Sequence, residues 1–395
     1  MVKKKILYVG LSSHYTEGTT YQDQELVMQN IQDGHAVVYV SDCNLYESGV
    51  LRVTEPEIKK MKCGATLIRP KCMYTNTVSV FRNYLSQYLR FVWIYKTINH
   101  ILSEMDPHII YSHNPTIPEI CSYIKIKKKN PDVKIYYDYH IDSLNRGVFR
   151  LPKIFMYFLH ENIYRLFLKR SLDSVEKIFY IWGGTKQYIS TNYGIPDDML
   201  EFLPLGGRVP DRVGYLCNRN KVRKDLQLGD DIILFIHTGK LSSEKRTSEI
   251  INAFKSVDND KFRLIILGSI PAEQEDELSS LINSDSRIQY LGWKTGSELQ
   301  EYLCASDVYI QLGSASATMQ NALCCGCPVL LNSCNGYYNE FMRGNGMFVN
   351  DKEELMDALT LISENPNVLE TMKDATWKIA SELLDYKKIA ARIYE

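Results

Sequence analysis

Short apolar runs, each followed by a polar or glycine-bearing loop, recur in order through the second half of the chain. The runs predict strands at Ile232–His237, Phe262–Leu267, Ile288–Tyr290, Val308–Gln311 and Val329–Leu331. Helical patterns separate them at Thr247–Lys255, Glu273–Asn283, Gly296–Ala305 and Thr318–Cys325. This alternation is typical of βαβ units, which build a parallel sheet. The loops after the strands therefore gather at one edge of the sheet, where open α/β sheets bind ligands.

The first half of the chain shows the same alternation. Strands are predicted at Lys5–Val9, Ala36–Val40, Thr66–Ile68, Ile109–Tyr111, Lys134–Tyr137 and Lys177–Ile181. Helices are predicted at Gln22–Asp33, Tyr84–Met105, Ile117–Lys129, Phe149–Ser171 and Thr185–Tyr193. The two halves are separated by a polar stretch with Gly and Pro, about Leu205 to Asp230, which we interpret as a linker.

The length of 395 residues is too great for one ordinary core and suits two domains. We therefore expect an α/β fold of two Rossmann-like domains facing across a cleft. Residues 1–208 form the first domain in this interpretation, and residues 209–375 form the second. Residues 376–395 are predicted to be helical, and they either cap the second domain or cross back to brace the first.

Composition excludes several classes of protein. Apolar residues make up 45% of the chain and charged residues 24%, which is typical of soluble globular proteins. A formal net charge of −1 excludes nucleic acid as the main partner. The apolar run at Ile6–Val9 is shorter than a signal-peptide core, and no stretch is long and apolar enough to span a bilayer. We expect a cytoplasmic protein whose ten scattered cysteines are reduced thiols.

Two lysines mark the first strand end of the second half as a candidate anion site. Lys240 and Lys245 flank a Ser-Ser loop that opens a helix, and Gly239 precedes them. Ammonium groups beside helix N-terminal amides form a cradle for a phosphate or diphosphate. The alternative is a pair of solvated loop lysines.

Candidate residues in the first half lie at two strand ends. Gly10 begins a loop before a helix, where backbone amides can approach a ligand. Asp138, His140 and Asp142 follow another strand and share one side by period-two alternation. They suit an acid/base pair or a clamp for a substrate hydroxyl, whereas a metal site lacks an identifiable third ligand. The alternative is a loop histidine with local hydrogen bonds.

These segments together resemble the retaining GT-B glycosyltransferases of the group-1, or GT4-like, family. The segments that carry the resemblance are Gly239-Lys240 with Lys245, Leu291-Gly-Trp293, Ser306-Asp-Val308 and Asn321-Ala-Leu-Cys-Cys-Gly-Cys-Pro-Val329. Leu203-Pro-Leu-Gly-Gly resembles the family's hinge entry, and the resemblance covers nearly the whole chain. It implies that Gly239, Lys240, Lys245 and Gly10 hold the donor diphosphate. It also implies nucleotide or sugar contacts at Leu291, Trp293, Ser314, Ser316, Thr318 and Asn321.

The chain departs from the family at two positions. Members usually carry two glutamates eight residues apart in the last motif, and the corresponding residues here are Gly313 and Asn321. Asn321 can still hydrogen-bond a ribose hydroxyl, but Gly313 has no side chain with which to replace a carboxylate. The loop from Gly313 to Thr318 supplies hydroxyls and backbone amides instead.

The sequence therefore predicts a glycosyltransferase that moves a sugar from a nucleotide-diphosphate-sugar to a glycan or lipid-linked acceptor. The resemblance implies retention of configuration and a role in surface polysaccharide biosynthesis. His140 and Asp142 are the predicted catalytic residues, and neither a metal nor another cofactor is expected, because lysines take the cation's role. The alternatives are a non-catalytic GT-B protein that binds a nucleotide-sugar or glycan or supports a partner enzyme, and a sugar-nucleotide epimerase.

Two basic, aromatic stretches lie in the first half, at Tyr84–Lys96 and Phe149–Arg170. Basic amphipathic helices of this kind can lie on an anionic membrane surface. The stretches therefore suggest peripheral contact with the cytoplasmic face of a membrane, and the alternative is a pair of ordinary domain helices with solvated basic side chains.

Overall fold

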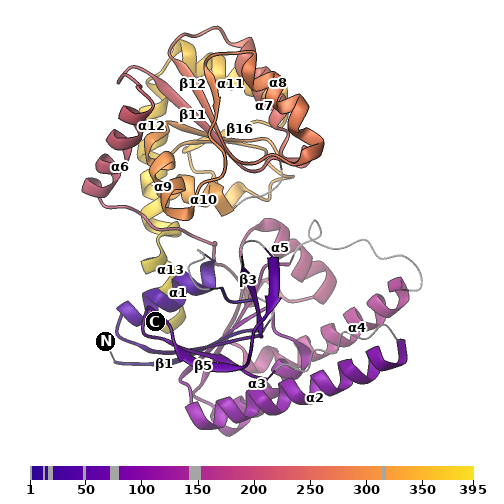
Figure 1. Ribbon diagram of the computed structural model, residues 1–395. Helices are drawn as coiled ribbons and strands as arrows, with labels where there is room; N and C mark the ends of the chain where they lie inside the picture. Colours follow the sequence, from indigo (N-terminus) through magenta and orange to yellow (C-terminus); the bar gives the residue numbers. More distant parts are fainter. Residues whose placement is uncertain are drawn as a thin grey trace. The chain divides into compact units, whose positions relative to one another are not determined.

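The structure is a computed structural model that describes residues 2–11, 14–16, 21–47, 50–71, 80–141, 153–313 and 317–395. The chain forms two compact units, Met1–Pro204 with Ala390–Glu395, and Leu205–Ile389 (Figure 1). The first division thus falls shortly before residue 208. The return to the first unit comes within α13 (Tyr386–Tyr394), so only the end of the 376–395 segment belongs there.

The first unit is built on an eight-stranded sheet in the order β10-β9-β8-β7-β1-β2-β6-β5. Its strands are β1 Lys5–Gly10, β2 Ala36–Ser41, β5 Glu57–Lys60, β6 Thr66–Arg69, β7 Ile109–His113, β8 Lys134–Tyr139, β9 Lys177–Tyr180 and β10 Leu200–Phe202. All neighbours pair in parallel except β5 and β6. A separate antiparallel hairpin joins β3 (Asn44–Glu47) to β4 (Val50–Val53). The short β3, β4, β5 and β10 were absent from the sequence prediction because they lack a long apolar run.

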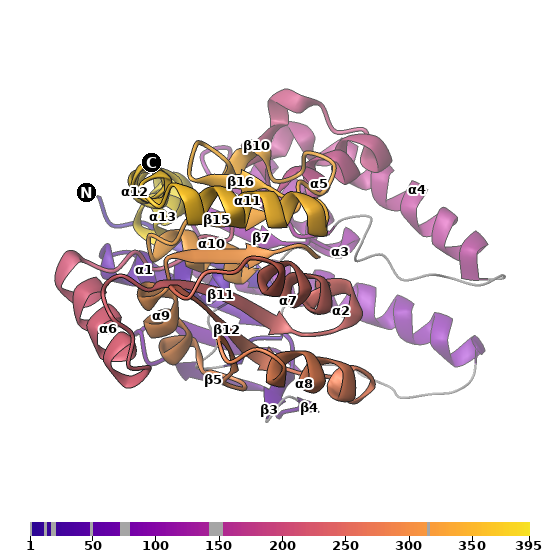
Figure 2. The same cartoon turned by 90° about the horizontal axis from the view of Figure 1, so that it is seen from above.

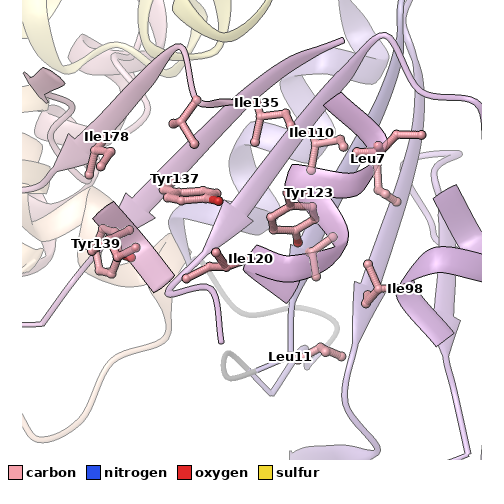
Figure 3. Close-up of a cluster of buried hydrophobic side chains, with 14 of the residues drawn as sticks. Leu7, Leu11, Ile98, Ile110, Ile120, Tyr123, Ile135, Tyr137, Tyr139 and Ile178 are labelled. Atoms are coloured by element: carbon pink, nitrogen blue, oxygen red, sulfur yellow. The ribbon is translucent and has the colours of Figure 1, made fainter. Parts of the chain in front are cut away.

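The two faces of this sheet carry different cores. Leu7, Ile110, Ile135, Tyr137 and Ile178 point to the face covered by α2 (Val80–Met105) and α3 (Ile117–Lys129), as Figure 3 shows. Aromatic side chains line the other face, among them Tyr8, Tyr39, Tyr111, Tyr136 and Phe179. Because successive strand residues alternate between faces, Asp138 belongs to the aromatic face. The remaining helices are α1 Gln22–Gln32, α4 Lys153–Ser171 and α5 Gly183–Tyr188.

The second unit is a six-stranded parallel sheet in the order β13-β12-β11-β14-β15-β16, which is the Rossmann order 3-2-1-4-5-6. Its strands are β11 Ile233–Lys240, β12 Phe262–Ser269, β13 Ile288–Tyr290, β14 Val308–Gln311, β15 Val329–Leu331 and β16 Gly346–Phe348. On one face, α7 (Thr247–Ser256) lies between α8 (Glu275–Asn283) and α11 (Lys352–Glu364), as Figure 2 shows. The other helices are α6 Arg212–Asp225, α9 Gly296–Ala305, α10 Ala317–Cys324 and α12 Val368–Ile379.

The interpretation of Leu205–Asp230 as a linker was wrong for most of its length, because α6 occupies Arg212–Asp225. The Asp211 side chain caps this helix by accepting a hydrogen bond from the Gly214 backbone N–H. Two of its arginines bind one carboxylate: Arg219 and Arg223 donate to Asp307 at 2.7 and 3.1 Å. A polar helix of this kind gives a weak apolar period, so the sequence alone hides it.

The end of the chain is fastened to the first unit by aromatic contacts. The Tyr394 hydroxyl donates a hydrogen bond to Asp33 at 2.9 Å, and its ring lies 4.3 Å from that of His35. Among the helices that the structure describes, none has the length and apolar content needed to cross a membrane.

Candidate functional site

In the second unit, the carboxyl ends of β11 and β14 form the point where the strand order reverses. Ligands of open α/β sheets bind in the crevice outside such a point. Here backbone packs directly on backbone, because Gly239, Gly268 and Gly313 end or follow three neighbouring strands. A Cβ on Gly268 would lie 1.7 Å from the Gly239 carbonyl oxygen. A Cβ on Gly313 would lie 2.0 Å from the carbonyl oxygen of Glu244. Only glycine permits these approaches.

The tight packing holds the turn that carries Lys245. This residue closes a 3-10 turn, Ser243–Lys245, just before α7, and is only 8% exposed. A Cβ on Gly239 would lie 3.3 Å from Lys245 Cε, so the lysine stem lies against that glycine. Burial lowers the pKa of Lys245, and Glu244 and Cys334 offset only part of this effect. An ammonium group that has lost hydration gains strongly from a bound anion.

The other predicted diphosphate ligand in this turn lies differently. Lys240 is the last residue of β11, which continues beyond the predicted end because Gly239 and Lys240 pair with Gly268 and Ser269. Its side chain is exposed. The structure therefore brings Gly239 and Lys245 together, and leaves Lys240 at the surface of the strand end.

The sequence analysis did not identify His237, which hydrogen-bonds Thr247 just after the Lys245 turn. The side chain is fully buried, with Nδ1 2.9 Å from the Ile310 carbonyl oxygen and Nε2 3.1 Å from Thr247 Oγ1. A carbonyl only accepts, so Nδ1 carries the proton and Nε2 accepts from the Thr247 hydroxyl. Burial lowers the pKa of His237 to about 4. The neutral imidazole thus anchors the first residue of α7 directly behind Lys245.

The remaining predicted residues of the second unit are more dispersed. Leu291 is half-buried, and Trp293 is 72% exposed. Thr318 and Asn321 lie on α10 and are half-buried. Asn321 Oδ1 would come within 2.9 Å of a Cβ on Gly207, so its side chain packs against that backbone. Ser314 and Ser316 lie outside the described residues.

In the first unit, β1 is flanked by β2 and β7, which again makes a reversal point. Gly10 ends β1 and is buried there. Two strands away, on β8, Asp138 Oδ2 lies 3.0 Å from both His113 Nδ1 and His140 Nε2, and the two imidazole rings meet edge to face at 4.3 Å. His113 was not predicted, although its place at the end of a strand next to β8 is a signal that could have found it. Asp142 falls outside the described residues.

The charges of this group favour an ionised Asp138. Burial by itself would raise the pKa of this carboxyl group, but His140 and His113 outweigh burial and hold the pKa well below its ordinary value. The same contact raises the pKa of His113, although burial opposes the protonated form. Asp138 also reaches the aromatic face, where it adds to the effect of burial in raising the pKa of Tyr111.

His113, Asp138 and His140 offer three ligand atoms within 4.8 Å of one another, so the third ligand missing from the sequence exists. Their hydrogen bonds nevertheless fit protons better than a metal ion. Asn114 Oδ1 accepts from the His140 backbone N–H at 3.2 Å, which turns its Nδ2 toward His113 Nε2 at 3.0 Å. Nδ1 and Nε2 of His113 are thus both engaged, by Asp138 and by Asn114, and a metal ion on Nδ1 would displace the contact with Asp138.

Residues 218–378 match the family model described as glycosyl transferases group 1. This part of the chain is similar to the group 1 glycosyltransferases. A curated relative, the alpha-monoglucosyldiacylglycerol synthase of Acholeplasma laidlawii, is 28% identical over 171 residues, or 40% of this chain and 42% of that enzyme. The alignment thus spans less than half of the relative's length.

Solved structures show that the resemblance in fold extends over the whole chain. A glycosyltransferase from Rickettsia africae has a TM-score of 0.69 and 16% identity, covering 99% of this chain and 96% of that one. Anabaena HepE in complex with UDP has a TM-score of 0.65 and 15% identity, with 98% of each chain covered. The fold is GT-B, as predicted, and family and fold together support a glycosyltransferase.

Proposed function

We propose that the protein transfers a sugar from a nucleotide-diphosphate-sugar to a glycan or lipid-linked acceptor. One observation carries this proposal: the Lys245 turn, a buried ammonium group held by glycine packing at the reversal point of the second sheet. Its position at the start of α7 adds helix N-terminal amides to the lysine charge. Charge that grows on a departing nucleotide diphosphate would be stabilised there without a metal ion.

The first unit would contribute hydroxyl recognition. His140 is one-quarter exposed and rests on a buried carboxylate, which suits contact with a hydroxyl of the donor sugar or the acceptor. Gly10 remains a proposed backbone contact for the donor diphosphate. Retention of configuration follows from the family resemblance alone. The other proposed contacts with the donor are Lys240, Leu291, Trp293, Ser314, Ser316, Thr318 and Asn321. Asp142 remains a proposed catalytic residue.

The acceptor class is proposed from the relative that is named as a synthase of alpha-monoglucosyldiacylglycerol. A lipid-linked acceptor would require contact with a membrane surface, and the basic residues of α2 and α4 suit an anionic one. A role on the cytoplasmic face in the assembly of a surface glycan is consistent with this acceptor.

The donor proposal is tested by calorimetric titration of UDP, GDP and their sugar conjugates into the full-length protein. Lys245→Ala should weaken diphosphate binding by about a hundredfold, because a buried charge-assisted contact contributes about 1.5–3 kcal/mol. Lys255→Ala, at the other end of α7, is the matched control and should bind as the wild type does. Equal affinity of Lys245→Ala and wild type would refute the assignment.

A second candidate is a GT-B protein that binds a nucleotide-sugar without transferring the sugar. The specific observation is Gly313, which has neither the family carboxylate nor room for one. The two candidates differ in nucleotide release measured with lipid and glycan acceptors present. Tight donor binding with no release under any acceptor would favour the second candidate.

A further inference from the structure

We propose that Gln22 and Asp138 are positioning residues that fix His140 in the form protonated on Nε2, which leaves Nδ1 to accept a hydrogen bond from a reactant hydroxyl. The proposal rests on the proposed function for the identity of the reactant. It adds to the sequence prediction one supporting residue, Gln22, and the assignment of the reactive atom. The position of the proton on His140 follows from which neighbouring atoms can donate a hydrogen bond and which can only accept one.

The orientation of the Gln22 amide is determined by the chain carbonyl on its other side. Gln22 is the first residue of α1 and is 6% exposed. Its Nε2 donates to the Pro204 carbonyl oxygen at 2.8 Å. A carbonyl has no proton to donate, so the amide nitrogen must face Pro204. The amide oxygen, Oε1, is thereby turned toward His140 Nε2 at 3.1 Å.

His140 Nε2 therefore faces two acceptors. One is Gln22 Oε1, and the other is Asp138 Oδ2 at 3.0 Å. If Nε2 carried a lone pair instead of a proton, three electron-rich atoms would meet in a buried place, and Asp138 would lose a partner that keeps it ionised. The proton of neutral His140 therefore resides on Nε2.

Nδ1 is then the chemically available nitrogen. The backbone N–H of His140 is held by Asn114 Oδ1, which fixes the residue at the strand end. No hydrogen bond to Nδ1 occurs within the part of the chain that the structure describes, and the side chain is 25% exposed. A lone pair in this position accepts a hydrogen bond from a sugar or acceptor hydroxyl. His113 cannot take this role, because Asp138 and Asn114 occupy both of its nitrogens.

The tautomer is measured directly by long-range ¹H–¹⁵N NMR correlation on protein labelled at its eight histidines. His140→Asn identifies the His140 signals by their absence. In the neutral form of His140 we expect a protonated Nε2 and an unprotonated Nδ1 in the wild type. Protonated Nδ1 in neutral His140 would overturn the proposal.

Two variants of Gln22 test its part. Gln22→Leu removes the acceptor and should shift His140 toward a mixture of tautomers. Gln22→Glu keeps an acceptor for Nε2–H and should retain the wild-type tautomer, although it cannot donate to Pro204. Gln29→Leu is the control, because Gln29 lies on the same helix and its side chain donates to Asp33. A wild-type tautomer in folded Gln22→Leu would remove Gln22 from the proposal.

Kinetics separate positioning from general structural support. With a donor and acceptor that turn over, Gln22→Leu should lower kcat about tenfold with little change in KM, and Gln22→Glu should recover most of kcat. Equal losses in both variants would indicate a structural role only and would count against the proposal. If no donor turns over while the NMR results hold, the proposed function fails and the tautomer assignment stands.

Discussion

The two candidate sites occupy equivalent places on their sheets but are built in different ways. The Lys245 turn is held by backbone contacts between glycines, and its supporting residues lie within or beside successive strand ends. The His140 site is held by hydrogen bonds of the Gln22 and Asn114 side chains, which reach His140 and the Pro204 backbone carbonyl from distant parts of the chain. Backbone packing leaves a sequence motif, because only glycine fits. A side-chain network leaves little trace, since each residue type is common elsewhere.

This difference predicts that the Lys245 turn is most sensitive to added side-chain volume, whereas the His140 site is most sensitive to loss of charge. The largest effect is expected at Gly313. Gly313→Glu introduces the carboxylate that the family resemblance leads us to expect, but it places Cβ 2.0 Å from the Glu244 carbonyl oxygen. We expect a loss of at least about 3 kcal/mol in unfolding free energy, measured by urea denaturation, because the contact is with backbone. Gly214→Ala, where a Cβ meets only the flexible Asp211 side chain, is the control. Unchanged stability would show that the turn adapts.

The buried His237 makes the second unit sensitive to acid. Its pKa of about 4 lies below the ordinary value of 6.5, so the unfolded chain binds more protons between these values. The stability from neutral His237 is therefore complete above about pH 6.5 and falls as pH drops toward 4, by about 3 kcal/mol. Urea denaturation at pH 7 and pH 4.5 should show a smaller loss in His237→Gln than in wild type. Equal losses would contradict the assignment.

In the first unit, Asp138→Asn removes a charge without removing volume. His113 then loses the carboxylate that raises its pKa, and we expect about 2 kcal/mol of destabilisation at pH 5.5. A histidine with a raised pKa stabilises the fold below its unfolded pKa, and this stabilisation disappears as pH rises through the folded value. The difference between wild type and variant should thus be smaller at pH 8. If the stability difference between wild type and variant grew as pH rises, Asp138 would not stabilise the protonated form of His113.

The smallest effect is expected at Thr247, whose hydroxyl hydrogen-bonds His237 beside the turn that the glycines hold. Thr247→Val removes the donor to His237 Nε2 but keeps the branched shape at the start of α7. We expect about 1 kcal/mol of lost stability and a few-fold loss of diphosphate affinity. Ser248→Ala, one residue along the helix, is the comparison. An affinity unchanged in Thr247→Val would show that Lys245 is held by the glycines alone.

Most of the fold could be predicted because strands and helices leave periodic patterns. The alternating runs located the long strands of both sheets, and Gly239 and Lys245, which the sequence analysis grouped, lie in contact. Prediction failed for α6, whose polar surface hides its period, and for β11, whose end depends on pairing with β12. Lys240 was grouped with Lys245 by spacing, although the extended strand leaves its side chain exposed.

The order of apolar runs and the placement of glycines were enough to specify two Rossmann-like domains and a turn suited to an anion. Local periodicity and the steric need for glycine act over a few residues, so they can be predicted from the sequence. Sequence spacing already grouped Asp138 with His140, but the contacts of His140 with Gln22 and Asn114 required the tertiary structure. The contacts of His140 with Gln22 and Asp138 depend on the order of the strands in the sheet and on the face to which each side chain points. The local sequence around each residue does not determine the order of the strands.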